Sequence, residues 1–407
     1  MTAEIDRLHA LDAVRVIALL LGIVLHGAMS FMMPIPALDS SQSTTLAVAF
    51  YVIHIFRMSA FYLIAGFFAR MVVERRGVEA FIKDRAKRIV IPMIGLWPVL
   101  LALIVPVIIW GTTKTFPEGP PPGLESPEGV FPLLHFWFLY YLVIFYILAL
   151  GVRAVVENVL DRGGALRKAV DSAVRVVVSS YFAPVLLAVP IFWILYSDPA
   201  WIPWAGIPTP DQGLDPKVPA LVGFGTAFGL GWLVHRQIGL LQEWRKRWIP
   251  HLAIAVGLSV VCLSIGGVEF DLMNPDRTTL MVVPGPEYMR IVYAACYTMA
   301  VFYWSFALVG VCISFFSTAS ARWRYVADSS YWLYLMHVPV LWFFAVVVSD
   351  WPLHWSIKFP LIMAVSVYVL LLSYRYWVRG TWIGALLNGR RRPPLTESTP
   401  PATTAEV

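Results

Sequence analysis

The chain has few charged residues. Asp, Glu, Lys and Arg make up 14% of its 407 residues, whereas an average soluble domain has about 25%. So few charges cannot cover the surface of a soluble protein of this length. Apolar residues reach 59%, and apolar runs of around twenty residues recur along almost the whole chain, which is the length that crosses ~30 Å of hydrocarbon. The composition predicts an all-α, polytopic membrane protein.

Cysteine and the common catalytic motifs are also scarce. Cys262, Cys296 and Cys312 all fall inside apolar segments without paired spacing, so neither a disulfide framework nor a metal site is expected. The sequence contains no HExxH, Walker, GxGxxG or GxSxG pattern. These absences disfavour zinc hydrolases, P-loop enzymes, dinucleotide-binding domains and hydrolases with a nucleophile elbow.

About ten apolar runs are long enough to be transmembrane helices. They lie near residues 12–33, 46–69, 89–110, 133–151, 176–196, 220–235, 249–267, 291–316, 329–348 and 359–377. With a cytoplasmic N-terminus, the outside segments hold few cations, namely Lys114, Lys217, Arg277 and Lys358. The positive-inside rule therefore places both termini in the cytoplasm. We expect one transmembrane domain over 1–380 and a disordered cytoplasmic tail over 381–407.

The first span contains three ionisable residues, which are costly at membrane depth and therefore functional candidates. Arg15 and His26 are eleven residues apart, so they share one helix face at depths that differ by ~16 Å. Asp12 can pair with Arg15 on the same side. The alternatives are that Arg15 extends to the lipid headgroups and that His26 is a hydrogen-bonded packing residue.

Other ionisable residues follow in later spans. His54 and Arg57 are one helical turn apart in the second span, and the depth of Arg57 favours a bound anion, a carboxylate partner or a water-filled cavity. His135 opens the fourth span, where it can instead belong to an aromatic belt. His337 lies mid-span before Pro339, which frees a backbone carbonyl that can satisfy it. Arg85, Lys87 and Arg88 stand at the opposite, cytoplasmic mouth, where ordinary anchoring is the alternative.

These groups fit acyl transfer from a thioester to an alcohol. A buried imidazole can take a proton from a hydroxyl nucleophile, and Arg57 offers positive charge near the developing oxyanion. A coenzyme A donor would add an anionic nucleotide for the basic residues at the cytoplasmic mouth. Buried His, Arg and Asp also form proton relays, so the alternative is a proton-coupled transporter of a small anionic or sugar-like substrate. A membrane scaffold is a third hypothesis.

Five blocks of the sequence, in order, resemble the acyltransferase-3 family of integral membrane acyltransferases. They are RLHALDAVRVIALLLGIVLHG (7–27), FRMSAFYLIAGFFA (56–69), RAKRIVIPM (85–93), HFWFLYYL (135–142) and SSYWLYLMHVPV (329–340). The first contains the family's Arg followed after ten residues by a His, here Arg15 and His26. One departure is Ala65, which stands where the family often has Ser. The second and third blocks most resemble members that modify periplasmic glucans.

The resemblance implies a bacterial inner-membrane enzyme that moves an acyl group from succinyl-CoA or acetyl-CoA to a glycan hydroxyl. It implies that His26 is the essential histidine, supported by Arg15, and that Arg57 and Arg88 contact the donor or line the active site. The expected partners are acyl-CoA, the glycan and the bilayer, without nucleic acid or metal, and the apolar exterior permits a homodimer. The candidate catalytic residues are His26, Arg15 and Asp12; the substrate-binding ones are His54, Arg57, His135, Trp137, His337 and Tyr334; the CoA-binding ones are Arg85, Lys87 and Arg88.

Overall fold

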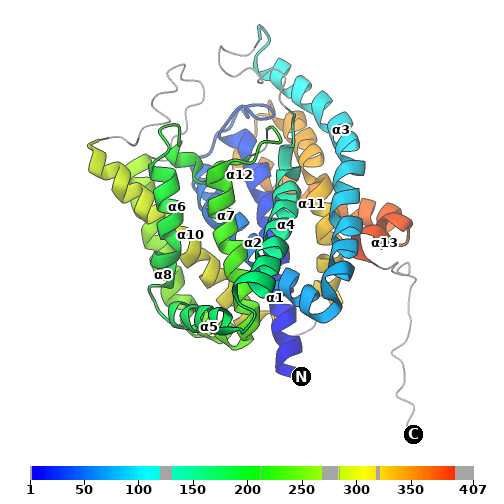
Figure 1. Cartoon of the computed structure of the whole chain (residues 1–407). Helices are drawn as coiled ribbons and strands as arrows, with labels where there is room; N and C mark the ends of the chain where they lie inside the picture. Colours follow the sequence, from blue (N-terminus) through cyan, green and yellow to red (C-terminus); the bar gives the residue numbers. More distant parts are fainter. Residues whose placement is uncertain are drawn as a thin grey trace.

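The computed structural model describes residues 2–119, 131–210, 212–267, 283, 285–317 and 321–389. Within them the chain is almost entirely helical, and the one β-bridge joins Pro132 to Gln212 (Figure 1). The long helices are α1 (Thr2–Ala28), α2 (Thr44–Arg85), α3 (Ile91–Thr115), α4 (Trp137–Val155), α5 (Ala165–Val178), α6 (Ala183–Tyr196), α7 (Val218–Val234), α8 (Leu241–Gly266), α10 (Glu287–Phe315), α11 (Ala321–Val348) and α12 (Trp355–Ser373). Shorter elements are η1 (Met29–Phe31), η2 (Ala86–Val90), η3 (Leu134–Phe136), η4 (Val156–Leu160), η5 (Pro203–Ala205), η6 (His235–Leu240), η7 (Tyr374–Val378) and α13 (Trp382–Asn388).

The predicted helical membrane bundle is confirmed. Seven helical stretches of the described residues are long and apolar enough to cross a membrane, or eight if the bent pair α5 and α6 is counted. Two of the stretches, Thr44–Thr115 and Val218–Gly266, each contain two of the predicted spans. Inside the first, Gly77 interrupts the helix with a φ of 81°, a conformation that glycine adopts without steric cost. The number of crossings and the side of the termini remain predictions.

The segment predicted as a span over 176–196 is not one continuous helix. Helix α5 ends at Val178, and α6 begins at Ala183 at an angle of 105° to it. Pro184 lies in the first turn of α6, where its missing N–H costs no helical hydrogen bond. The 14 residues of α6 are fewer than the ~20 that span a bilayer, and α5 runs across the end of the bundle (Figure 1).

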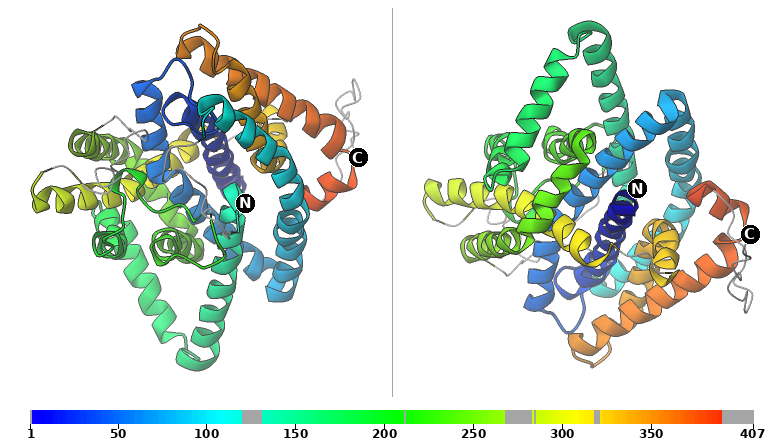
Figure 2. Two further views of the ribbon diagram at one scale, coloured as in Figure 1. Left: turned by 90° about the horizontal axis from the view of Figure 1, so that it is seen from above. Right: turned by 90° about the horizontal axis from the view of Figure 1, so that it is seen from below.

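Helix α1 lies in the middle of the bundle, packed against α2, α10, α11 and α12 (Figure 2). The most apolar windows of the α1, α10 and α11 stretches are 61%, 67% and 67% buried, whereas that of the α4 stretch is 28% buried. Apolar side chains exposed on the outer surface of a membrane helix bundle face lipid. These parts of α1, α10 and α11 therefore lie inside the protein, and His337 of α11 is 2% exposed.

Helices α2 and α7 approach each other unusually closely through two glycines. A Cβ built on Gly231 of α7 would lie 1.8 Å from the Leu63 carbonyl oxygen of α2. A Cβ on Gly66 of α2 would lie 2.0 Å from the Phe228 carbonyl oxygen. Small residues allow such backbone contact between membrane helices, and this contact fixes the position of α2.

The first residues of the predicted tail are ordered as helix. Helix α13 occupies Trp382–Asn388, with Gly384 and Leu387 buried. Its Asn388 side chain donates to the Asp328 carbonyl, 3.1 Å away on α11. The remainder of the predicted tail, 390–407, lies outside the described residues, so its disorder stays a prediction.

A buried ion pair ties the loop between α1 and α2 to α12. Lys358, expected in an outer loop, lies in the first turns of α12, where its Nζ is 2.9 Å from Asp39 Oδ1 and the two side chains are 0% and 1% exposed. The ammonium also donates to Ser40 Oγ at 2.9 Å and to the Ser349 carbonyl at 3.1 Å. Burial raises the pKa of the Asp39 carboxyl, and the hydrogen bond from Lys358 opposes that change.

Lys358→Met is expected to lower the free energy of unfolding by about 3–5 kcal/mol, because it leaves a buried carboxylate without its cation. Thermal unfolding in detergent measures the effect as a lower Tm. Lys246→Met is the matched control, because the Lys246 side chain is 68% exposed in its pair with Glu243 and such pairs contribute about 0–1 kcal/mol. Equal Tm values for Lys358→Met and the wild type would contradict a stabilising role.

Candidate functional site

Three histidines from distant parts of the sequence meet inside the bundle. His26 lies on α1, His135 on η3 and His337 on α11. The His337 ring centroid is 5.1 Å from that of His26 and 5.1 Å from that of His135. The structure therefore brings together three of the candidate residues around His337.

Backbone carbonyls of α11 orient two of these rings. Pro339 has no N–H, so the Leu335 carbonyl four residues earlier is free, and His135 Nε2 donates to it at 3.2 Å. His337 Nδ1 donates to the Tyr334 carbonyl at 2.7 Å, and Tyr334 Oη donates to the His135 carbonyl at 2.6 Å. In their neutral forms His135 and His337 then carry the lone pair on the other ring nitrogen.

The other nitrogens of these two rings, and one nitrogen of His26, are buried without a hydrogen bond. Within the described residues, His135 Nδ1, His337 Nε2 and His26 Nδ1 have no hydrogen-bond partner. Buried polar atoms in proteins are nearly always hydrogen-bonded. Here three unpaired ones lie on adjacent rings, unlike those of His251 on α8, whose two ring nitrogens are also buried and unpaired but stand apart from this cluster. His135 and His337 thus each offer a proton-accepting nitrogen to a group that enters between the rings, and His26 Nδ1 is the third ring nitrogen without a partner there.

A guanidinium lies next to the histidines without a carboxylate. Arg57 of α2 crosses α1 at Gly22, one turn before His26, where a Cβ would lie only 2.4 Å from its Nη1. Its Nε is buried without a hydrogen-bond partner, and no ion pair involves Arg57 in the described part of the chain. Of the three environments expected for Arg57, the carboxylate is not found there. Gly22 is a residue that the sequence reasoning missed, although it stands four residues before His26.

His54 faces a different environment from the other histidines. Its Nε2 is 3.4 Å from Thr209 Oγ1, and its ring stacks on Phe50 with centroids 5.6 Å apart. Phe50 in turn stacks on Trp204 in the loop between α6 and α7. Trp137 is also apart from the histidine rings: it is buried, with its ring stacked on Phe224 at 5.5 Å.

A separate cavity of about 360 Å³ is lined by three of the cationic candidates, Arg15, Arg85 and Arg88. Arg15, paired with Asp12 at 3.3 Å, and Arg88, paired with Asp84 at 3.0 Å, reach it from two sides. Its lining includes Asp12, Arg15, Phe61, Ala65, Phe68, Arg85, Arg88, Phe138, Leu142, Tyr146, Asp328, Ser330, Tyr331, Tyr334, Leu387 and Asn388. Lys87 is exposed and outside this lining. Leu387 and Asn388 belong to the segment that the sequence assigned to a disordered tail.

Tyr334 connects the cavity to the histidines. It lines the cavity, and its hydroxyl and carbonyl make the two hydrogen bonds to His135 and His337 described above. His26 and Arg57 are not in the cavity lining. Tyr334 therefore stands between a cavity with three arginines and a cluster of three histidines. No group of three or more His, Cys, Asp or Glu in the described residues is arranged to hold a metal ion.

Comparison with known proteins assigns the chain to a family. The family model named Acyl_transf_3, described as "Acyltransferase domain", matches residues 8–375. Proteins named "Glucans biosynthesis protein C" from Shigella dysenteriae serotype 1 (strain Sd197) and Escherichia coli (strain K12) are each 28% identical to the chain over 171 residues, which is 40% of this chain and 43% of each relative. The chain thus matches less than half the length of these relatives. No solved structure matches it.

The match covers the first block from residue 8, the other four blocks completely, and every candidate site residue, from Asp12 to His337. Together with the long apolar helices, it identifies a multi-pass membrane protein. The predicted resemblance is confirmed: the chain belongs to the acyltransferase-3 family of membrane acyltransferases.

Proposed function

We propose that the chain is an acyl-CoA-dependent O-acyltransferase of the bacterial inner membrane, which moves a succinyl or acetyl group to a hydroxyl of an extracytoplasmic glycan, with a periplasmic glucan as the first acceptor to test. The observation that carries the proposal is the cluster of His26, His135 and His337 with unpaired buried nitrogens beside the unpaired Arg57. The family supports acyl transfer, and the name of the relatives supports the glucan.

In the proposed reaction, His26 is the general base. It removes the proton from the acceptor hydroxyl while the oxygen attacks the thioester carbonyl carbon. The carbon–sulfur bond then breaks, and His26 gives the proton to the coenzyme A thiolate that leaves. Arg57, held over Gly22 one turn before His26, stabilises the negative charge that develops on the carbonyl oxygen. A covalent acyl-histidine is a variant of the same scheme.

The donor would occupy the cavity lined by Arg15 and Arg88. Guanidinium groups suit phosphates because their N–H donors match two oxygens at once. The pantetheine arm would extend toward the histidines past Tyr334, which lines the cavity and donates to the His135 carbonyl, so this side chain would have to move for the thioester to reach His26. Asp12 holds Arg15 in the cavity wall through their ion pair.

Arg88→Gln is expected to raise the KM for acyl-CoA about tenfold or more with a small change in kcat, because a hydrogen bond to a charged group contributes about 1.5–3 kcal/mol. Acyl-CoA consumption by membranes, with mass spectrometry of the glycan, measures both constants and identifies the acyl group. Lys87→Gln is the matched control, one residue away and outside the cavity.

An equal rise in KM for Lys87→Gln and Arg88→Gln would contradict the placement of the donor. Substrate flux in proteoliposomes without any acylation would contradict the enzyme and favour the transporter. A folded protein that shows neither flux nor acylation would favour the scaffold.

A further inference from the structure

A second cavity, of about 430 Å³, lies apart from the histidines between α4, α5 and α7. Most of its lining is apolar, and Leu148 and Val152, which line it, are 51% and 62% exposed. It is therefore open sideways, toward the surface that faces lipid. Figure 2 shows α4 and α5 leaving the bundle and converging away from it. We call this cavity the side groove; its lining is Arg70, Phe145, Leu148, Ala149, Val152, Arg153, Val156, Glu157, Leu166, Arg167, Val170, Asp171, Leu221, Gly225, Phe228, Gly229, Trp232, Leu233 and Arg236.

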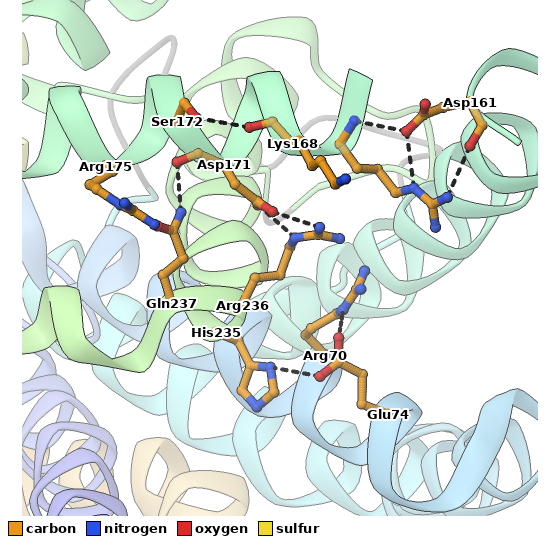
Figure 3. A network of polar contacts seen from close by, with 11 residues as sticks. Arg70, Glu74, Asp161, Lys168, Asp171, Ser172, Arg175, His235, Arg236 and Gln237 are labelled. Carbon is orange, nitrogen blue, oxygen red and sulfur yellow. Dashed lines mark hydrogen bonds and ion pairs between the residues drawn. The ribbon is translucent and has the colours of Figure 1, made fainter. Parts of the chain in front are cut away.

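The side groove contains charged residues as well as apolar ones. Its lining has four arginines, each paired with a carboxylate: Arg70 with Glu74, Arg153 with Glu157, Arg167 with Asp161 and Arg236 with Asp171. Figure 3 shows several of these groups beside α5, among them Arg236, bound to Asp171 at 2.6 and 2.7 Å, and Arg70, whose Nε binds Glu74.

Two of the arginines keep donors that the described residues do not use. Arg70 and Arg153 each bind a glutamate four residues later through Nε alone. Within the described part of the chain, no hydrogen bond engages their terminal nitrogens. The two terminal nitrogens of a guanidinium can donate to two oxygens of one phosphate.

Helix α5 adds basic side chains beside the groove. It is 14 residues long, with Arg167, Lys168 and Arg175 among valines and alanines, and it lies across the end of the bundle at which the N-terminus is found (Figure 1). Short basic amphipathic helices of this type lie in the plane of the membrane interface.

We propose that the side groove binds one anionic glycerophospholipid from the bilayer. Its acyl chains lie along the apolar walls of α4 and α7, and its phosphate binds the terminal nitrogens of Arg70 and Arg153. Because the four arginines of the lining are each paired with a carboxylate, the excess positive charge beside the groove comes from Lys168 and Arg175 of α5. This charge favours an anionic headgroup over a zwitterionic one. This site does not depend on the proposed reaction, because its lining shares no residue with the cavity assigned to acyl-CoA.

The test is native mass spectrometry of the purified full chain in detergent, with phosphatidylglycerol or phosphatidylcholine added. The wild type is expected to retain one phosphatidylglycerol under conditions that remove phosphatidylcholine. Gly229→Leu is expected to lose it, because a Cβ on Gly229 meets no atom within 4 Å and the side chain fills the groove without disturbing the fold. Gly257→Leu is the matched control, a helical glycine with equally open surroundings outside the groove.

The charge is tested separately. The double variant Arg70→Gln/Arg153→Gln is expected to bind phosphatidylglycerol about tenfold more weakly. Its control is Lys83→Gln/Lys246→Gln, which removes two exposed cations from ion pairs outside the groove. Equal retention of both lipids by the wild type, or unchanged retention by either the folded Gly229→Leu or the folded arginine variant, would overturn the proposal. If one variant fails to fold, the other decides.

Discussion

His26→Ala is expected to reduce the rate of acyl transfer by about 10²–10⁴-fold, the contribution typical of a general base. The imidazole lies 5.1 Å from His337 with its Nδ1 buried and unpaired, and alanine leaves no group there to accept the hydroxyl proton. Acyl-CoA consumption and glycan acylation in membranes measure the loss. The amount of protein in the membrane is expected to stay unchanged.

His251→Ala is the matched control for this prediction. His251 is also buried, on α8, but its ring contacts Tyr181, Tyr303 and Phe306 instead of the histidine cluster. We expect it to retain most of the activity. Full activity of His26→Ala would end the catalytic assignment, and an equal loss for both variants would point to packing rather than proton transfer.

Gly231→Val is expected to destabilise the protein by about 3 kcal/mol or more, above the usual range for overpacking. The added Cβ would lie 1.8 Å from the Leu63 carbonyl oxygen and 3.0 Å from the Phe67 nitrogen. Both are backbone atoms, which cannot rotate away, so α7 must separate from α2. The measurement is the Tm in detergent together with the yield of protein in the membrane.

Gly229→Ala is the control that separates the effect of the backbone contact from the effect of replacing glycine in a helix. It lies two residues earlier on the same helix, and a Cβ there meets no atom within 4 Å. We expect its Tm to equal or exceed that of the wild type. A Tm for Gly231→Val as high as that of Gly229→Ala would show that the two helices do not touch as the structure has them.

Much of the fold was predictable because apolar length and charge position act locally. The apolar run before His26 and the run around His337 form helices that contain these residues, as predicted. The break within the predicted span 176–196 was not predicted, since apolar content alone does not reveal where a helix turns. Helix α13 was assigned to the tail because seven residues carry too little periodic signal.

The candidate site was predictable residue by residue but not as an arrangement. The cost of polar groups in lipid marks His26, Arg57 and His337 in the sequence alone. Which of them meet depends on how the helices pack, and this packing joins His135 to His337 while leaving His54 beside Thr209.

The amino-acid sequence by itself determined that this protein is a membrane helical bundle of the acyltransferase-3 family, because composition, span length and motif order need no knowledge of packing. Only the tertiary structure decided that Arg57 rests on Gly22 and that Tyr334 stands between the arginine-lined cavity and the histidines. Contacts between helices arise from side-chain shape across segments that are far apart in the chain, and no local pattern encodes them.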